Sequence, residues 1–388
     1  MRGSVVKRGK SYSVVVDLGR DPITGKRRQK WHSGYRTKRD AERAVAELIG
    51  TVNSGTYIAR TRQTLSEYAG EWLTAIEPTV RPATHYSYAR NLRLHVLPYL
   101  GGGALVEIDA GALNGLYARL LAEGRADRVG GGLSPRSVRY VHTIVHRAMK
   151  DAVKWGRLAR NAADAADPPR ASSSGSPDMV TWTVDELRAF LDGVRDDRLY
   201  AAYLLLATTG MRRGEALGLR WADLDLDGSR AAIRQTAITV HHDARLGTPK
   251  TAKGRRTVTL DAGTVAGLRE HRKRQNEERL LMGAGWTDAG LVFSRPDGGL
   301  LHPERFTRTF VERVRQLGLP RIRLHDLRHG WATMALAAGV HPKVVQERLG
   351  HASISITLDT YSHVTGSLHS DAAEKVAGLV LGRSLANG

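Results

Sequence analysis

The chain has 388 residues, which is too long for one ordinary core, so two to three domains of roughly 100–200 residues are expected. Hydrophobic residues make up 41% of the chain and charged residues 25%, a balance typical of soluble globular proteins. Lysine and arginine number 59 against 39 aspartate and glutamate, which gives a net charge of +20. This excess favours a polyanionic partner, nucleic acid first and an anionic membrane surface second.

The sequence argues against membrane insertion and secretion. Its most apolar run, residues 201–207, is far shorter than the roughly 18 residues of a spanning helix. Residues 1–20 contain only a short apolar run at 14–16, which is too short for the core of a signal peptide. The chain has no cysteine, so disulfides and thiolate metal sites are excluded. We therefore expect a protein of the reducing cytoplasm.

Residues 1–60 form the most basic part of the chain, with 14 Lys+Arg against 5 Asp+Glu. Strands are predicted at residues 11–18 and 26–32, followed by a helix over about residues 37–50. The side chains predicted to contact DNA are Lys26, Arg27, Arg28 and Lys30. A merely solvated basic face is the alternative, because charge runs alone are common.

Residues 61–167 read as a packet of four helices, predicted to begin near Thr64, Pro82, Asp109 and Ser134. The last of these, over residues 134–154, carries basic residues at approximate helical spacing. Among them, Arg136, Arg139 and Arg147 are predicted DNA contacts. A solvated helix face explains the same spacing equally well.

Residues 168–177 form a linker rich in proline, serine and glycine, and a second large domain follows over residues 178–388. Thr183 and Glu186 make a capping box that starts a helix. Strands are predicted over residues 229–240 and 255–260, and helices from Asp261 to the end of the chain.

The last domain concentrates chemically informative residues. Arg212 stands in a glycine-bracketed turn, where a planar guanidinium can donate two bonds to phosphate. His325 and Arg328 lie three residues apart at the start of a predicted helix and share one face. His351 follows a predicted helix end at Gly350. On spacing alone, Tyr361 reads as a core aromatic.

Taken together, these motifs resemble the tyrosine recombinase, or phage integrase, family of site-specific DNA recombinases. The segment TGMRRGEALGLRW is similar to the family's first arginine box, HDLRHG to its His-x-x-Arg box, and LGHASISITLDTYSHV to its closing box. This resemblance covers about residues 178–365. Residues 64–160 resemble, more loosely, the family's core-binding domain. Residues 1–60 resemble the arm-binding domain of integrases, including those of actinobacterial mobile elements.

The resemblance implies roles for the two arginines and the tyrosine. Breaking a phosphodiester without a metal requires a nucleophile, charge neutralisation at the non-bridging oxygens and an acid for the leaving group. Tyr361 is implied as the nucleophile, which would form a 3′-phosphotyrosine and free a 5′-hydroxyl. Arg212 and Arg328 are implied to clamp the phosphate oxygens.

Four further residues complete the implied site. Lys250, in a hairpin turn, is the implied acid for the 5′-oxygen, with nearby Lys253 as the competitor. His325 is implied as an acid/base relay toward the tyrosine, and His351 as a phosphate hydrogen-bond donor. Glu215 is expected to orient its neighbours rather than to react. No metal ion or other cofactor is implied.

The resemblance also implies a mainly α fold with small β elements. It comprises a small N-terminal sheet plus helix, a helical, SAM-like core-binding domain, and a mostly α catalytic domain of the DNA breaking-rejoining type. Double-stranded DNA, at core and arm attachment sites, is the implied substrate. A tetramer on DNA is expected through exchange of a C-terminal tail with an apolar stripe at Leu368, Ala372, Val376 and Leu379. An excisionase or a DNA-bending protein is a possible partner, and a bacterial, nucleoid-associated location is expected on DNA.

Two rival readings use the same residues. His325 and His329 have the spacing of a zinc-binding HExxH motif, but the glutamate base is missing and Arg328 would bring a cation beside the metal. A basic DNA-binding regulator with an inactive site is the other rival. The intact set of six catalytic positions argues against that reading.

Overall fold

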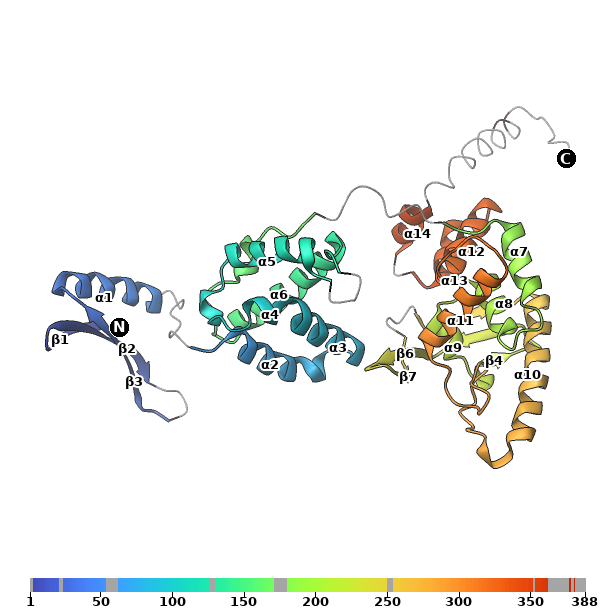
Figure 1. The fold of residues 1–388 in the computed structure, drawn as a ribbon, viewed down its shortest axis with the longest axis horizontal. Helices are drawn as coiled ribbons and strands as arrows, with labels where there is room; N and C mark the ends of the chain where they lie inside the picture. Colours follow the sequence, from blue (N-terminus) through green and yellow to red (C-terminus); the bar gives the residue numbers. More distant parts are fainter. Residues whose placement is uncertain are drawn as a thin grey trace. The chain divides into compact units, whose positions relative to one another are not determined.

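The computed structural model describes residues 3–20, 24–53, 62–125, 130–170, 180–249, 254–351 and 353–361, with residues 377 and 380. The chain divides into two compact units, Met1–Ser174 and Gly175–Gly388 (Figure 1). Within the first unit, the division between residues 1–60 and 61–167 stays a prediction. No helix among the described residues is long and apolar enough to cross a bilayer.

The N-terminal part is a three-stranded antiparallel sheet with one helix. Strands β1 (Gly3–Arg8), β2 (Ser11–Arg20) and β3 (Arg27–Tyr35) follow in that order, and α1 (Lys38–Asn53) packs on one face. Its small core includes Val14 and Val16 of β2, both fully buried. Strand β1 was not predicted, because its run of two valines is too short to signal a strand.

The helical part of the first unit contains α2 (Leu65–Ile76), α3 (Pro82–Asn91), α4 (Leu97–Leu100), α5 (Ala110–Glu123) and α6 (Pro135–Lys154). The helix starts predicted at Thr64 and Ser134 are confirmed; Thr64 forms a capping box with Glu67, and the Ser134 side chain caps α6. The segment predicted as helical over residues 82–97 is helical throughout, but a π-helical stretch at Leu92–Val96 divides it into α3 and α4. Pro98 lacks the N–H that an α-helix requires and disfavours regular helix one turn earlier.

The second unit carries two small sheets within a largely helical body. Strands β4 (Leu224–Asp225), β5 (Arg230–Ile233) and β8 (Arg256–Thr259) form one sheet, while β6 (Thr236–Val240) and β7 (Asp243–Gly247) form a hairpin. The prediction of one strand over residues 229–240 was wrong. Two strands occupy this range. Strand β5 ends at Ile233 and pairs with β8, and β6 begins at Thr236 and pairs with β7 in a separate sheet.

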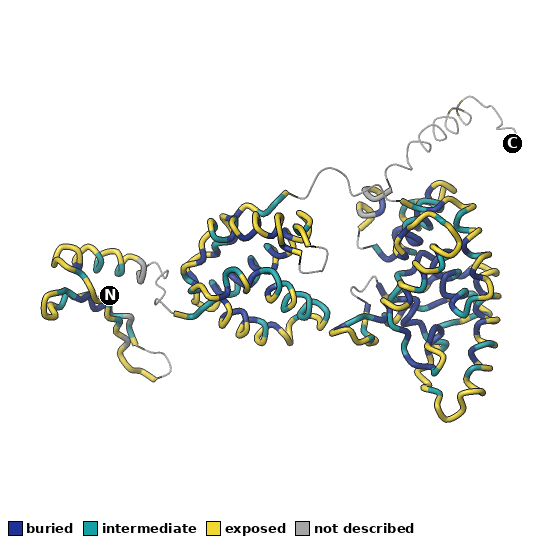
Figure 2. Tube along the Cα trace, viewed as in Figure 1, coloured by how far each residue is buried: buried dark blue, intermediate teal, exposed yellow. Residues whose placement is uncertain are grey.

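The helices of this unit are α7 (Val184–Gly193), α8 (Tyr200–Thr209), α9 (Arg213–Leu217), α10 (Ala262–Met282), α11 (Pro303–Gln316), α12 (Asp326–Ala337), α13 (Pro342–Leu349) and α14 (Ile354–Tyr361). Short 3-10 turns of this unit lie at Trp221–Asp223 and Gly283–Gly285, and those of the first unit lie at Glu77–Thr79, Leu105–Glu107 and Ala162–Ala165. Helix α8 is mostly buried (Figure 2). Tyr203 on this helix packs against Phe190, Phe306 and Phe310. Burial of these aromatic rings fixes α8, whose carboxyl end leads directly to Arg212.

Candidate active site

Arg212 is held at a sharp corner between two helices. Helix α8 ends at Gly210, whose φ of 65° is left-handed and favours glycine. The Arg212 side chain donates from Nη1 to Glu215 Oε1 at 2.8 Å, and its backbone N–H donates to Glu215 Oε2 at 3.0 Å. Glu215 is 4% exposed. The buried carboxylate therefore fixes both the backbone and the side chain of Arg212.

Arg328 projects from the first turn of α12 into the protein interior. It is 3% exposed, and its two terminal nitrogens donate to the carbonyls of Gly210 and Leu349, each at 2.8 Å. Arg323 forms a bidentate pair with Asp326 and also donates its backbone N–H to that carboxylate, so the first turn of α12 is fixed. A buried cation is tolerated here because backbone carbonyls satisfy its donors.

The carboxyl end of α13 is where these arginines meet. The last carbonyls of a helix lack partners within the helix, and they lie at the negative end of its dipole. Arg256 Nε donates to Arg348 O at 2.6 Å, and Arg212 Nη2 donates to Gly350 O at 3.2 Å. The carbonyl of Leu349 accepts from both Arg212, at 3.4 Å, and Arg328, at 2.8 Å. Three successive carbonyls thus gather arginines from three separate elements.

His351 follows this helix end and connects it to α14. Gly350 adopts a left-handed φ of 67°, and the backbone N–H of His351 donates to the carbonyl of Gln346 at 3.1 Å. Its ring Nδ1 lies 2.9 Å from Thr357 Oγ1 on α14. Tyr361 is the last residue of α14, and its side chain is outside the described part of the structure. The structure therefore gives the helix that carries Tyr361 but no geometry for its hydroxyl.

The two histidines of the site are held in their neutral form. Burial lowers the pKa of His325 to about 4, assisted by the positive charges of His329, Arg328 and Arg212, although solvent still reaches the side chain. Burial together with Arg328 and Arg212 also lowers the pKa of His351 to about 4. With pKa values near 4, both imidazoles stay unprotonated at neutral pH in the DNA-free protein.

Glu215 remains ionised despite its burial. Burial alone would raise the pKa of this carboxyl, but the hydrogen bonds and charges of Arg256 and Arg212 lower it below its usual value. The predicted role of Glu215 as an orienting group agrees with these contacts. Arg256 was not singled out from the sequence. The available signal was its place in the predicted strand, two residues before the buried Val258.

The predicted leaving-group acids cannot be placed. Lys250 and its competitor Lys253 lie outside the described residues, which resume at Gly254. The zinc reading can be examined at His325 and His329, whose rings lie 5.0 Å apart at 87°. Within the described part of the chain, no group of three or more His, Asp or Glu side chains has the arrangement of a metal site.

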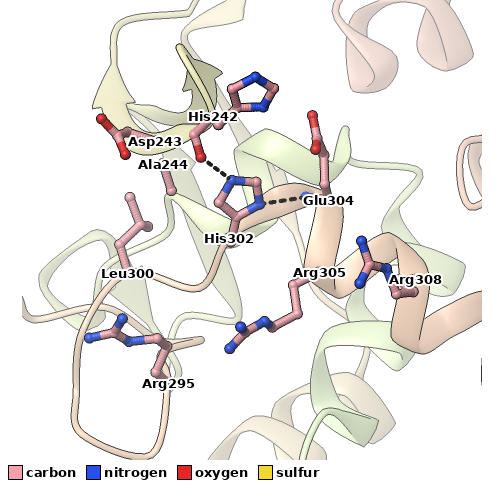
Figure 3. A pocket seen from close by; sticks show the side chains of 9 residues that line it. All are labelled: His242, Asp243, Ala244, Arg295, Leu300, His302, Glu304, Arg305 and Arg308. Carbon is pink, nitrogen blue, oxygen red and sulfur yellow. Dashed lines mark hydrogen bonds between the residues drawn. The ribbon is translucent and has the colours of Figure 1, made fainter. Parts of the chain in front are cut away.

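A polar depression of about 620 Å³ lies beside the β6–β7 hairpin, and Arg305 and Arg308 of α11 line it (Figure 3). His302 at its centre accepts the backbone N–H of Glu304 through Nδ1 at 3.2 Å, which leaves Nε2–H to donate to the carbonyl of His242 at 2.8 Å. This bond anchors the turn of the hairpin to the start of α11. The anchor lies a few residues before the segment that contains Lys250.

The predicted DNA-contacting residues of α6 differ in their contacts with the rest of the protein. Arg147 lies over the Tyr88 ring at 5.5 Å and donates to the Tyr88 hydroxyl at 3.2 Å. Arg139 donates to the carbonyl of Pro169 at 3.2 Å, while Arg136 is exposed. The stripe read from the sequence is therefore partly a packing feature.

The basic residues of the N-terminal sheet do not share one face. Lys30 pairs with Val16, which is buried beneath α1, whereas the neighbouring Trp31 belongs to the open face because side chains alternate along a strand. Arg8 of β1 lies 4.7 Å from the Trp31 ring. Arg27 is paired with Asp17 at 2.6 Å. Lys26 is exposed, and the side chain of Arg28 is outside the described structure.

Comparison with known proteins gives matches over most of the chain. Residues 181–367 match the phage integrase family, residues 4–52 an arm DNA-binding domain, and residues 64–117 the N-terminal SAM-like domain of phage integrases. A XerC-like tyrosine recombinase of Caldanaerobacter subterraneus subsp. tengcongensis is 28% identical over 394 residues, which cover 97% of this chain and 98% of the relative. An integrase of Streptomyces ambofaciens is 29% identical over 359 residues, covering 90% and 88%.

Solved structures share the fold. The Tn1549 transposon integrase in complex with transposon right-end DNA aligns with a TM-score of 0.67 at 20% identity, over 81% of this chain and 99% of that chain. A lambda integrase from a tetramer bound to a Holliday junction aligns with a TM-score of 0.52 at 17% identity, over 90% and 96%. The predicted fold class, mainly helical with small sheets, is confirmed.

These matches and the clustered arginines define an enzyme that breaks and rejoins DNA strands. More narrowly, the chain belongs to the tyrosine recombinase, or phage integrase, family. Its activity is site-specific DNA recombination. The family resemblance drawn from the sequence motifs is thereby confirmed.

Proposed function

We propose that the chain integrates and excises a mobile DNA element through a covalent intermediate on Tyr361. The hydroxyl oxygen of Tyr361 attacks the scissile phosphorus, the bond from phosphorus to the 5′-oxygen breaks, and a 3′-phosphotyrosine forms. Attack by a 5′-hydroxyl on this ester reverses the step and rejoins strands without ATP. The observation that carries the proposal is the Leu349 carbonyl, which accepts hydrogen bonds from Arg212 and Arg328 together.

Arg212 and Arg328 neutralise the charge that develops on the non-bridging oxygens. Both guanidiniums are oriented before DNA binds. Arg212 already donates to Glu215, and Arg328 already donates to backbone carbonyls. Preorganised donors stabilise a transition state without reorganising during the reaction. The Arg212 side chain is 40% exposed, so it is accessible to a phosphate, while Arg328 supports the site from within.

Three further residues transfer protons or donate a hydrogen bond at the phosphate. His325, neutral in the free protein, accepts the proton of Tyr361 as that residue attacks. Lys250 protonates the departing 5′-oxygen, with Lys253 as the competing acid. His351 donates a hydrogen bond to a phosphate oxygen from a ring whose other nitrogen faces Thr357. An anionic phosphate will raise the pKa of both histidines, since an opposite charge favours the imidazolium.

The remaining parts of the chain position DNA. Residues 64–160 bind the core site, with the exposed Arg136 of α6 among the contacts. The open face of the N-terminal sheet, which carries Arg8 and Trp31, contacts arm sites. This proposal adds Arg8 and Trp31 to the predicted contacts Lys26, Arg27, Arg28 and Lys30, of which Lys30 lies on the side of α1.

Recombination requires four copies of the chain on paired DNA sites. The lambda integrase that shares this fold was solved as a tetramer on a Holliday junction. We propose the same stoichiometry here, with the apolar stripe from Leu368 to Leu379 docking on a neighbouring copy. That stripe lies outside the described residues. An excisionase or DNA-bending partner is proposed from the function alone.

A nicked suicide substrate tests the covalent step. With the attachment site as substrate and EDTA present, the wild-type protein is expected to form a protein–DNA adduct that Tyr361→Phe does not form. Adduct formation by Tyr361→Phe contradicts the assignment of the nucleophile. Loss of the wild-type adduct in EDTA favours metal-dependent chemistry instead.

A further inference from the structure

Arg256 is a buried cation outside the proposed catalytic set. It lies at the start of β8, and its side chain is 9% exposed. Its guanidinium donates to both oxygens of Glu215, at 3.2 and 2.9 Å, and to the carbonyls of Arg348 and Gly254, at 2.6 and 3.4 Å. A planar fork of five donors is needed to serve acceptors on three sides at once.

Arg256 and Arg212 share one acceptor, the Glu215 carboxylate, and they also donate to neighbouring carbonyls at the end of α13. Both oxygens of Glu215 also accept from Arg212, through Nη1 at 2.8 Å and through the backbone N–H at 3.0 Å. On the other side, Arg256 holds the carbonyl of Arg348, while Arg212 holds those of Leu349 and Gly350. Two parallel links therefore connect Arg256 to Arg212, one through a carboxylate and one through the end of α13.

The Glu215 carboxylate is fully used in this arrangement. Two carboxylate oxygens provide about four acceptor positions, and four donors from two arginines fill them. Without Arg256, a buried carboxylate would retain a single cationic partner, Arg212. A buried charge that loses a partner attracts the remaining one more strongly, because the surroundings screen it poorly. Arg212 would then turn toward Glu215 and away from the phosphate.

We infer that Arg256 is a positioning residue for recombination, which keeps the Arg212 guanidinium directed at the scissile phosphate by saturating Glu215 and fixing the end of α13. This inference rests on the proposed role of Arg212 in charge neutralisation. Arg256 itself does not touch the DNA. Its loss is expected to act on the charge-neutralising step and to leave site binding intact.

The test compares two substrates in a single-turnover assay of adduct formation. One carries the natural phosphodiester and the other a methylphosphonate, which replaces one non-bridging oxygen by a methyl group and has no negative charge to neutralise. Arg256→Gln is expected to slow the reaction of the phosphodiester roughly 10- to 100-fold, since displacing a positioned group by about 1 Å can cost about 100-fold. With the methylphosphonate, the difference from wild type is expected to shrink to within a few-fold.

Arg198→Gln provides a matched control within the same unit. Arg198 also donates two bonds to one carboxylate, that of Glu278, and one each to the carbonyls of Ser294 and Arg295. Removing it deletes the same kinds of bond away from the arginine cluster. Arg198→Gln is expected to react at the wild-type rate on both substrates.

Arg256→Lys covers the case in which the glutamine variant does not fold. It keeps a positive charge beside Glu215, but one ammonium cannot span the carboxylate and the Arg348 carbonyl in the manner of a planar fork. It is expected to fold, bind the core site normally and show the same recovery on the methylphosphonate. Thermal unfolding and core-site affinity are measured alongside for each variant.

The outcomes separate this inference from the function on which it rests. Equal slowing of Arg256 variants on both substrates, or no slowing on either, overturns the positioning role. A wild-type protein that forms no adduct overturns the proposed mechanism itself. Arg212→Ala must show the same recovery on the methylphosphonate, since a defect that persists there removes the premise that Arg212 neutralises charge.

Discussion

The arginines of the second unit and the cations of the N-terminal sheet share a charge but differ in their surroundings. Arg256 and Arg328 are buried and donate to carbonyls or to Glu215, so their direction is fixed before DNA binds. Arg8 and Lys26 are exposed on a small sheet. Fixed, desolvated donors act on a transition state, whereas exposed ones mainly neutralise phosphate and are screened by salt. Substitution of the second-unit arginines should therefore change the rate of DNA cleavage, whereas substitution of the cations on the N-terminal sheet should change DNA affinity.

Removing Arg328 should have the largest effect of these substitutions. Arg328→Ala is expected to reduce single-turnover cleavage by about 100- to 1,000-fold, as observed for the loss of one preorganised donor to a developing charge. Core-site affinity should change far less. Arg195→Ala, which removes an exposed arginine paired with Asp192, serves as the control and should retain activity. A cleavage defect matched by an equal loss of affinity would remove the distinction between the two regions.

Gly210→Ala tests whether the corner that holds the arginines tolerates a side chain. A Cβ there would lie 2.7 Å from Leu349 and 3.0 Å from Trp331, at a φ of 65°. Strain of this kind costs about 1–3 kcal/mol, so the melting temperature should fall and cleavage should slow. Gly115→Ala in α5, where an added Cβ would meet nothing within 4 Å beyond the backbone of its own helix, should be neutral or slightly stabilising. Equal unfolding midpoints for the two variants would contradict the packing described at Gly210.

The lowered pKa values of His325 and His351 predict how the stability of the DNA-free protein depends on pH. His325 and His351 have pKa values of about 4 in the folded protein and about 6.5 when unfolded. The unfolded chain therefore binds more protons between these values, so stability rises with pH across this interval and levels off above it. Urea midpoints at about pH 5 and pH 7.5 measure the slope, which His351→Gln should reduce. An unchanged slope would place the protonation elsewhere.

Substitutions in the N-terminal sheet should have the smallest effect, and only on binding. Arg8→Ala is expected to weaken arm-DNA binding and to lower the slope of log affinity against log salt by about one unit, as for one lost phosphate contact. Lys38→Ala on α1, whose lysine pairs with Glu42, removes the same charge from the helix side and should change the slope less. Deleting residues 1–60 should abolish arm binding and preserve core-site binding. Equal losses at both sites would contradict the division of roles.

Local signals predicted local structure well. The helices predicted to start at Thr64 and Thr183 do so, because each start depends on a capping box between side chains only three residues apart. The break between β5 and β6 was not predictable in this way. It depends on pairing with β8 and β7, which are separate segments of the chain.

In the active site too, contacts between residues far apart in the sequence could not be predicted from local signals. Arg212, His325, Arg328 and His351 follow from the motifs; the structure brings Arg212, Arg328 and His351 to the carboxyl end of α13, and His325 lies near enough to both arginines to feel their charges. Arg256 was missed because its acceptors, Glu215 and the Arg348 carbonyl, lie 41 and 92 residues away in the sequence. Which face of the sheet each of the basic residues at 26–30 occupies was not predicted, since the strand register is set by β2; their role as DNA contacts stays a prediction.

The most direct test of the account is to identify the residue and the DNA end joined in the covalent intermediate. Protease digestion of the suicide-substrate adduct, followed by mass spectrometry, is expected to find a nucleotide linked through its 3′-phosphate to Tyr361. The released strand should carry a free 5′-hydroxyl. A nucleotide on any other residue, or a 5′-phosphate linkage, would contradict the proposed chemistry.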